Sequence, residues 1–131
     1  MTAKASFIEH DLPIVIVGTG FSGIAMAVML QKVGLNNFTL LEKAQDIGGT
    51  WRDNVYPGCA CDVPSALYSY SFAPNPAWSR VFAGQAEIKR YLQTTASVQG
   101  VKVDSPTTRA ANNLARPQTR AITITADGAI Y

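Results

Sequence analysis

Three glycines and one glutamate have the types and spacing of a site for a dinucleotide. Gly18, Gly20 and Gly23 form the pattern G-x-G-x-x-G in the stretch GTGFSG, and Glu42 follows further along the chain. Gly18 permits a tight turn, Gly20 lets the backbone approach a pyrophosphate, and Gly23 lets a helix pack against a strand. A carboxylate roughly twenty residues after the glycines can accept hydrogen bonds from both hydroxyls of an adenosine ribose.

The charge of Glu42 narrows the choice of nucleotide, because a carboxylate repels a 2′-phosphate and therefore favours FAD or NAD over NADP. The main chain at Phe21 and Ser22 lies at the start of the expected helix, where backbone amides and the helix dipole attract phosphates. The alternative interpretation of the glycines is a structural tight turn at the top of a sheet.

Regular elements flank the glycines in the order that this site needs. Residues 13–17 read PIVIV, which predicts a strand buried on both faces in a parallel sheet. Apolar positions after Gly23 predict a helix that stops at Gly34, and residues 38–41, FTLL, predict a second strand that leads into Glu42. Strand, glycine turn, helix and strand together indicate the start of a βαβ unit.

A second glycine pair precedes a long aromatic segment without a helical or strand period. Gly48 and Gly49 offer another place where backbone can come close to a large ligand. An isoalloxazine ring needs a wall that is flat and apolar with polar atoms at one edge, which Trp and Tyr side chains can build. The candidates for this wall are Trp51, Tyr56, Tyr68 and Tyr70. The alternative is that these aromatic residues anchor a long loop onto the core.

Cys59 and Cys61 are the two cysteines of the chain, and His10 is its one histidine. Two cysteines cannot build a disulfide framework or a four-cysteine zinc site, and a mixed site would need a further carboxylate. We therefore expect reduced thiols packed in a loop and no metal.

Composition excludes several classes of protein. Hydrophobic residues make up 47% of the 131 residues and charged residues 15%, which is typical of a folded domain and not of a disordered chain. A net charge of +2 gives no reason to expect nucleic acid or an anionic membrane as partner. The first residues lack the features of a signal peptide, and no apolar run is long enough to cross a membrane. We expect a cytoplasmic protein.

The second half of the chain carries weaker patterns. A helix is expected over residues 85–97, with strands possible at 101–103 and 107–110 and a strand at 121–125 that leads into a hairpin-type turn at 126–128. Only the first two strands are evident as parallel strands, and residues 44–84 have little to pack against. These features predict the opening part of a larger protein.

Three ordered motifs carry a resemblance to a known family. GTGFSG, LLEKAQDIGGTW and NVYPGCACDVPSALYSYSF together resemble the N-terminal FAD-binding segment of class B flavin-dependent monooxygenases, which include flavin-containing and Baeyer–Villiger monooxygenases. The resemblance is strong over residues 13–98 and weak over 101–131. It implies an α/β Rossmann-like FAD-binding unit with a long aromatic loop, in which residues 1–12 are a tail and 13–131 a partial FAD-binding domain. The family's NADPH domain, its linker fingerprint and its catalytic arginine are not found in the sequence.

The resemblance also implies roles for particular residues. Thr50, Trp51, Asp62 and Tyr68 match positions that line the flavin, whereas Ala60, Cys61 and Asp62 match a segment near the nicotinamide. Asp62 is the candidate catalytic residue, since in the family it helps to place the catalytic arginine and the NADP; the alternative is a turn-forming aspartate before Val63-Pro64.

Other positions match the family less directly or depart from it. Arg109 matches a position that contacts the adenine end through its backbone. Several ketone-oxidising relatives carry Arg where this chain has Ala60, and many carry His where it has Ala66, so the substrate class does not follow from the resemblance.

The leading interpretation is the FAD-binding portion of an NADPH-dependent flavin monooxygenase. In that family a peroxyflavin inserts one oxygen atom from O2 into a ketone or a soft nucleophile of a small organic substrate. This chain alone is not expected to turn over. The alternatives are an NAD-dependent dehydrogenase domain and a noncatalytic nucleotide-binding fragment.

Overall fold

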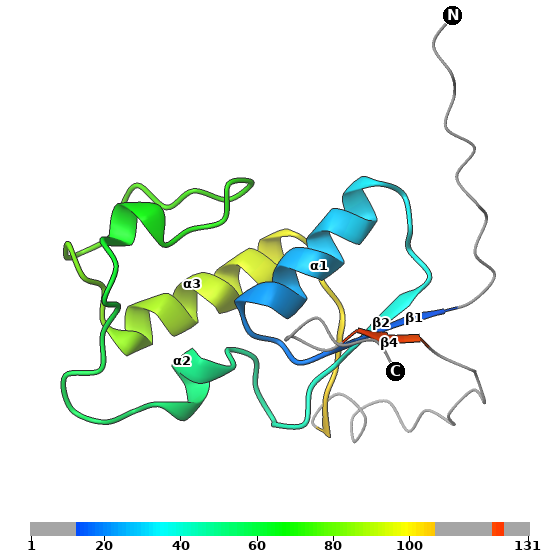
Figure 1. Ribbon diagram of the computed structural model, residues 1–131, viewed down its shortest axis with the longest axis horizontal. Coiled ribbons are helices and arrows are strands. Elements are labelled where there is room, and N and C mark those ends of the chain that lie inside the picture. The colour runs from blue at the N-terminus through cyan, green and yellow to red at the C-terminus, as the bar shows by residue number, and fades with distance from the viewer. Residues whose placement is uncertain (1–12, 107–121, 125–131) are drawn as a thin grey trace, which may run out of the picture.

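The computed structural model describes residues 13–106 and 122–124, in which four parallel strands form one sheet (Figure 1). The strands lie in the order β3-β2-β1-β4. Their bounds are Ile14–Val17 for β1, Phe38–Leu41 for β2, Val103–Asp104 for β3 and Ile122–Ile124 for β4. This order matches the first four strands of the doubly wound order 3-2-1-4-5-6.

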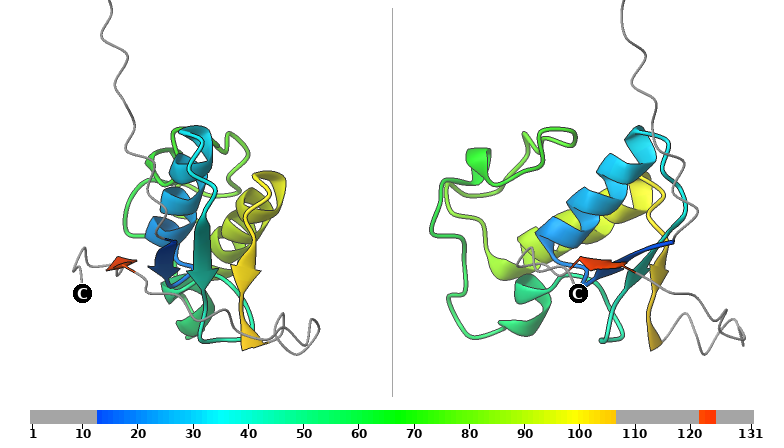
Figure 2. Two further views of the ribbon diagram at one scale, coloured as in Figure 1. Left: turned by 90° about the vertical axis from the view of Figure 1, so that its right-hand side faces the viewer. Right: turned by 45° about the vertical axis from the view of Figure 1, so that its right-hand side comes forward.

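Two longer helices lie on one face of the sheet, as the views in Figures 1 and 2 agree. Helix α1 spans Phe21–Lys32 and follows β1 directly, and helix α3 spans Gln85–Val98 and precedes β3. Between β2 and α3 lie the four-residue helix α2 at Thr50–Asp53 and the 3-10 helix η1 at Ser65–Leu67. The predicted Rossmann-like α/β fold is therefore confirmed.

The β1–α1–β2 unit packs as its apolar pattern requires. Ile16 of β1 pairs with Leu40 of β2, and both form a buried cluster with Ala27 of α1. Strands that are covered on a face by helices need continuous apolar runs, and PIVIV and FTLL supply them.

The segment between β2 and α3 has much more to pack against than its sequence suggests, so the expectation of an unsupported segment over residues 44–84 was wrong. Trp51, Cys61 and Tyr70 share one buried cluster with Ile24 of α1 and Leu92 of α3. This burial supplies the free energy that holds an irregular segment in one conformation.

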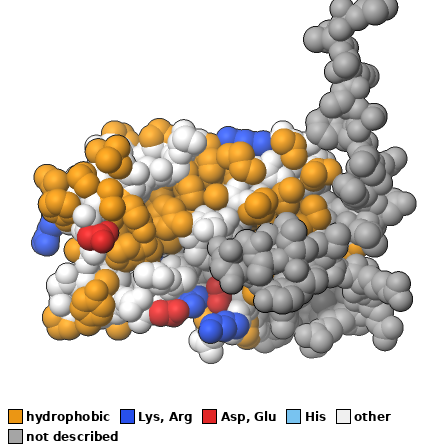
Figure 3. All heavy atoms as spheres, in the orientation of Figure 1, with side chains coloured by type: hydrophobic (Ala, Val, Ile, Leu, Met, Phe, Trp, Pro, Cys, Tyr) orange, Lys and Arg blue, Asp and Glu red, His pale blue; other side chains and the backbone are white. Residues whose placement is uncertain are grey.

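Hydrogen bonds also join the residues around Cys61 to those around Ala83 within this segment. The N–H of Cys61 donates to the Ala83 carbonyl at 2.9 Å, and the Ser65 Oγ accepts from the Ala83 N–H at 2.7 Å. Some of its apolar side chains nevertheless remain exposed, including Leu67 and Val81. Hydrophobic side chains are spread over much of the described surface in Figure 3.

The second half differs from its prediction in the pairing of its strands. The strand expected at 121–125 is present as β4, and it pairs in parallel with β1, so the sheet has four evident parallel strands and not two. The turn at 126–128 and the possible strand at 107–110 lie outside the described residues, as does Arg109. Among the helices of the described part of the chain, none has the length and apolar character needed to cross a membrane.

Candidate functional site

A cavity of about 590 Å³ opens where β1 and β2 end at their carboxyl edges. In doubly wound folds ligands bind outside these edges, and this volume lies within the usual range for small-molecule sites. The predicted site residues that line the cavity are Gly18, Gly20, Phe21, Ser22, Gly23, Glu42, Gly49, Thr50, Trp51 and Tyr68. The cavity is also lined by Val17, Thr19, Lys43, Gly48, Arg52 and Asp53, to which the sequence prediction gave no binding role except close backbone approach at Gly48.

The first glycine turn has the geometry that its motif predicts. Gly18 has φ +97°, a left-handed conformation that favours glycine, and its N–H donates to the Leu41 carbonyl at 2.8 Å. A Cβ on Gly23 would lie 1.9 Å from the Gly18 carbonyl oxygen. Gly23 is therefore required for the close approach of α1 to the end of β1.

The N-terminus of α1 faces the cavity without a side-chain cap. Gly20 is the N-cap residue and makes no side-chain hydrogen bond, so the first backbone N–H groups of the helix are available to a ligand. A Cβ on Gly20 would meet only the Gly49 Cα, at 3.9 Å. The space over this backbone is open, as a pyrophosphate site requires.

The second glycine pair lies directly beside the first turn. Gly48 has φ +135° and donates its N–H to the Thr19 carbonyl at 3.0 Å, and Gly49 has φ +51°. A Cβ on Gly49 would lie 3.0 Å from the Gly20 Cα. The two glycine segments, distant in sequence, therefore form adjoining walls of one cavity.

Glu42 lies at the tip of β2, as predicted, but its carboxylate is bound by the protein on both oxygens. The Thr19 N–H donates to Oε2 at 3.1 Å, and the Thr19 hydroxyl also donates to Oε2. Oε1 accepts from the Ala44 N–H at 2.9 Å and from the Arg52 Nη1 at 3.0 Å. Burial of this carboxyl opposes its ionisation, yet these hydrogen bonds and the Arg52 charge outweigh burial and lower the pKa of Glu42.

Thr19 and Arg52 are the functional candidates that sequence reasoning missed. Thr19 occupies a variable position of the glycine motif and is fully buried, and no spacing rule points to its hydroxyl. Arg52 comes directly after the second motif, LLEKAQDIGGTW, and its neighbours in sequence do not indicate that its side chain contacts Glu42. Only its place directly after the GGTW stretch was available as a signal.

Helix α3 supports the cavity wall from behind. The Asp46 carboxylate accepts hydrogen bonds from the Lys89 Nζ at 2.7 Å and from the Gln93 Nε2 at 3.0 Å to each oxygen. The Gln85 side chain donates to the Trp51 carbonyl. Polar groups on one face of α3 thus fix the connection that carries the second glycine pair.

The aromatic candidates divide into two groups. Trp51 donates its Nε1–H to the Tyr68 hydroxyl at 3.0 Å, and their rings meet edge to face at 5.7 Å, so they build a joint wall of the cavity. Tyr70 is buried and donates its hydroxyl to the Phe21 carbonyl at 2.7 Å, and Tyr56 is 62% exposed. Neither Tyr70 nor Tyr56 lines the cavity; Tyr70 anchors the loop, which was the alternative interpretation.

Cys61 and Asp62 do not line the cavity. Cys61 is buried in the core, and Asp62 is exposed, as are Ala60 and Ala66. Asp62 is nevertheless close enough to affect Tyr68: burial raises the pKa of Tyr68, the Trp51 hydrogen bond lowers it, and the charge of Asp62 adds to the rise. No group of three or more His, Cys, Asp and Glu side chains within residues 13–106 is placed to hold a metal ion.

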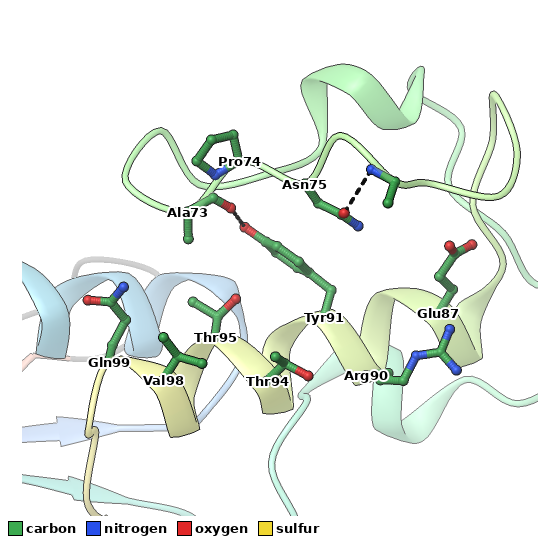
Figure 4. A pocket seen from close by; sticks show the side chains of 11 residues that line it. Ala73, Pro74, Asn75, Glu87, Arg90, Tyr91, Thr94, Thr95, Val98 and Gln99 are labelled. Atoms are coloured by element: carbon green, nitrogen blue, oxygen red, sulfur yellow. Dashed lines mark hydrogen bonds between the residues drawn. The ribbon is translucent and has the colours of Figure 1, made fainter.

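A separate cavity of about 430 Å³ lies on the other side of α3, under residues 73–77 (Figure 4). The Tyr91 hydroxyl donates to the Ala73 carbonyl at 2.7 Å and accepts from the Tyr70 N–H at 2.8 Å. Because these bonds satisfy the hydroxyl, Tyr91 fastens the loop to α3. This cavity contains none of the predicted site residues.

Comparisons with known proteins find one matching family and similar monooxygenases. The family described as NAD(P)-binding Rossmann-like domain matches residues 16–84. A Baeyer-Villiger monooxygenase of Streptomyces coelicolor is 50% identical over 100 residues, which are 76% of this chain and 19% of the relative. A Baeyer-Villiger monooxygenase of Pseudomonas aeruginosa is 55% identical over 80 residues, 61% of this chain and 15% of the relative.

The solved structure of OTEMO in complex with FAD and NADP is similar to this chain with a TM-score of 0.66 and 34% identity, over 72% of this chain and 19% of that one. The chain therefore spans about a fifth or less of the length of these relatives.

Proposed function

The chain belongs to the NAD(P)-binding Rossmann-like domain family, and from this premise we propose that it is the FAD-binding portion of an NADPH-dependent flavin monooxygenase. One observation carries the proposal. Both glycine segments, Glu42 and the Trp51–Tyr68 pair line a single cavity at the carboxyl ends of β1 and β2. A pyrophosphate, a ribose and a flat ring system each have a matching wall there.

The residues of this cavity would bind several parts of a flavin dinucleotide. The backbone at Gly18, Gly20 and the start of α1 would bind the pyrophosphate, and Glu42 would lie at the ribose. The rest of the cofactor would contact Gly49, Thr50, Trp51 and Tyr68. Trp51 and Tyr68 would present apolar rings to it, and the hydrogen bond from the Trp51 Nε1–H to the Tyr68 hydroxyl joins these two side chains. When bound, FAD would supply the redox chemistry, while these residues bind it, orient it and exclude water.

The activity of the whole protein is part of the proposal. The two named relatives are Baeyer-Villiger monooxygenases, and OTEMO binds FAD and NADP. We extend to this chain a role in oxygenation of a small organic substrate with O2 and NADPH, in the cytoplasm, with residues 1–12 as a tail and 13–131 as part of the FAD-binding domain. The chain alone is expected to show no turnover, because most of the length of these relatives lies outside it.

The purified 131-residue chain is expected to retain FAD or to take it up on reconstitution, because the cavity offers residues for its pyrophosphate, a ribose and its flat ring. Absorbance in the flavin band measures retention, and chromatography of the cofactor released by denaturation identifies it. A folded, colourless chain that does not bind added FAD but binds NAD would contradict the proposal and support the NAD-dependent dehydrogenase. Failure of the folded chain to bind either nucleotide would contradict the proposal and both alternatives.

Asp62 remains our proposed catalytic residue, and its exposure leaves the carboxylate accessible to groups outside this chain. In a full-length enzyme that carries this segment, Asp62→Ala is expected to leave FAD bound and to slow flavin reduction by NADPH by about tenfold or more. Stopped-flow absorbance measures the reduction rate, and Glu87→Ala, which removes a carboxylate of α3 at the separate cavity, is the control for a general charge effect. Loss of FAD in Asp62→Ala would show a structural role instead.

A further inference from the structure

Arg52 connects Glu42 at the tip of β2 with Asp46 in the following connection and with Asp53 of α2. Its Nη1 donates to the Glu42 carboxylate at 3.0 Å and to the Asp46 backbone carbonyl at 2.7 Å. Its Nε and Nη2 donate to the two carboxylate oxygens of Asp53 at 2.8 and 3.0 Å. The Arg52 side chain is 13% exposed and that of Glu42 is 4% exposed. A planar guanidinium with this many partners has a fixed position.

The buried Glu42 carboxylate depends on such a partner. A carboxylate removed from water is costly unless it is paired and hydrogen-bonded. Thr19 and Ala44 donate hydrogen bonds, but only Arg52 among the described residues forms an ion pair with it. The other charged groups around this end of the cavity are Lys43 beside Glu42, Asp53 on α2, Asp46 and Asp104, whose backbone carbonyl accepts the Glu42 N–H at 2.9 Å.

We infer that Arg52 is a positioning residue that keeps Glu42 charged and in place, and that it thereby makes the cavity select a ribose with free hydroxyls against a 2′-phosphorylated ribose. An arginine beside a ribose can instead bind a 2′-phosphate directly. Here the guanidinium already bonds two carboxylates and a carbonyl, so its charge is neutralised before a ligand arrives. The inference rests on the proposed function, since it requires an adenine nucleotide in this cavity.

The test compares two ligands that differ only in the 2′-phosphate, adenosine 5′-monophosphate and adenosine 2′,5′-bisphosphate. Calorimetry or ligand-observed NMR gives both affinities for the 131-residue chain after any bound nucleotide has been removed. The unsubstituted chain is expected to prefer the monophosphate by about tenfold, because like charges at close range are strongly disfavoured. Arg52→Gln is expected to reduce this preference to about twofold or less, mainly by weakening the monophosphate, and Arg52→Lys to keep most of it.

Arg90→Gln is the charge-matched control, because Arg90 lies on α3 at the separate cavity and not at the ribose end. It is expected to leave the preference unchanged within about twofold, since exposed charges at a distance are screened. Circular dichroism confirms that each variant is folded. If Arg52→Gln does not fold, Glu42→Gln and Arg52→Lys decide the question: Glu42→Gln should lose the preference and Arg52→Lys should keep it.

The outcomes separate the inference from the proposed function. If the folded chain binds neither ligand, the proposed function fails and the inference fails with it. If the chain binds with the expected preference and Arg52→Gln keeps that preference, the inference is overturned and the function stands. A variant that weakens only the bisphosphate would identify Arg52 as a direct phosphate ligand and would also overturn the inference. Loss of the preference in Arg52→Lys, with Arg90→Gln unchanged, would show that a cation paired with Glu42 does not maintain the preference and would also overturn the inference.

Discussion

Gly23→Ala is expected to lower the free energy of unfolding by about 3 kcal/mol or more, because a Cβ at this position overlaps the backbone. The Cβ would lie 1.9 Å from the Gly18 carbonyl oxygen and 3.0 Å from the Gly18 carbonyl carbon. A clash with backbone cannot be relieved by a change of rotamer. Gly18 cannot easily move either, because its N–H donates to the Leu41 carbonyl of β2 at 2.8 Å.

Urea denaturation followed by circular dichroism measures this effect. Gly84→Ala is the matched control, since Gly84 is also at a helix start, has φ −74° and has no atom within 4 Å of an added Cβ. Its expected cost is about 1 kcal/mol or less, the value for replacing an N-cap glycine. Equal midpoints for the two variants would show that α1 does not pack on the turn at the distance described.

The β1–α1–β2 unit could be predicted because its rules are local. The distance between glycines, the apolar runs on either side and the acidic residue at the end of β2 all lie within one stretch of sequence, and each has a separate physical reason. The pairing of β4 with β1 could not be predicted in this way, because a three-residue strand carries little pattern and its partner is distant in sequence.

The packing of residues 44–84 was missed for a related reason. Trp51 and Cys61 contact α1 and α3 in one cluster, but no period in an irregular segment shows which side chains face inward. Tyr68 and Tyr70 illustrate the limit. They are two residues apart and equally amphipathic in sequence, yet Tyr68 lines the cavity and Tyr70 is in the core. Only the course of the backbone determines that Tyr68 lines the cavity and that Tyr70 anchors the loop.

The site was predicted better for its backbone than for its side chains. Glycine positions follow from sterics, so the sequence could single out Gly18, Gly20, Gly23 and Gly49, which line the cavity. Glu42 was also found, but its bonds to Thr19 and Arg52 join residues that no motif connects. Hydrogen-bond networks between distant segments depend on the finished fold, which explains why the partners of Glu42 could not be predicted from sequence.

Gly20→Val, in contrast to the change at Gly23, is expected to leave the fold in place and to abolish retention of FAD. Gly20 has φ −78°, which any residue can adopt, and a Cβ there would meet only the Gly49 Cα, at 3.9 Å. The valine methyl groups would project into the cavity above the N-terminus of α1, where the pyrophosphate of a bound dinucleotide would lie. The expected cost in stability is about 1 kcal/mol, from the loss of the N-cap glycine.

Flavin absorbance per folded chain measures retention of FAD, and Gly84→Val supplies the control because it places the same side chain at the start of α3, outside the cavity. The control should retain FAD as the unsubstituted chain does, whereas Gly20→Val should retain none even when FAD is added in excess. Full flavin content in a folded Gly20→Val would place the pyrophosphate elsewhere and would refute the assignment of this turn. Because Gly23→Ala acts on folding and Gly20→Val on the ligand, the pair separates the two roles that one glycine motif combines.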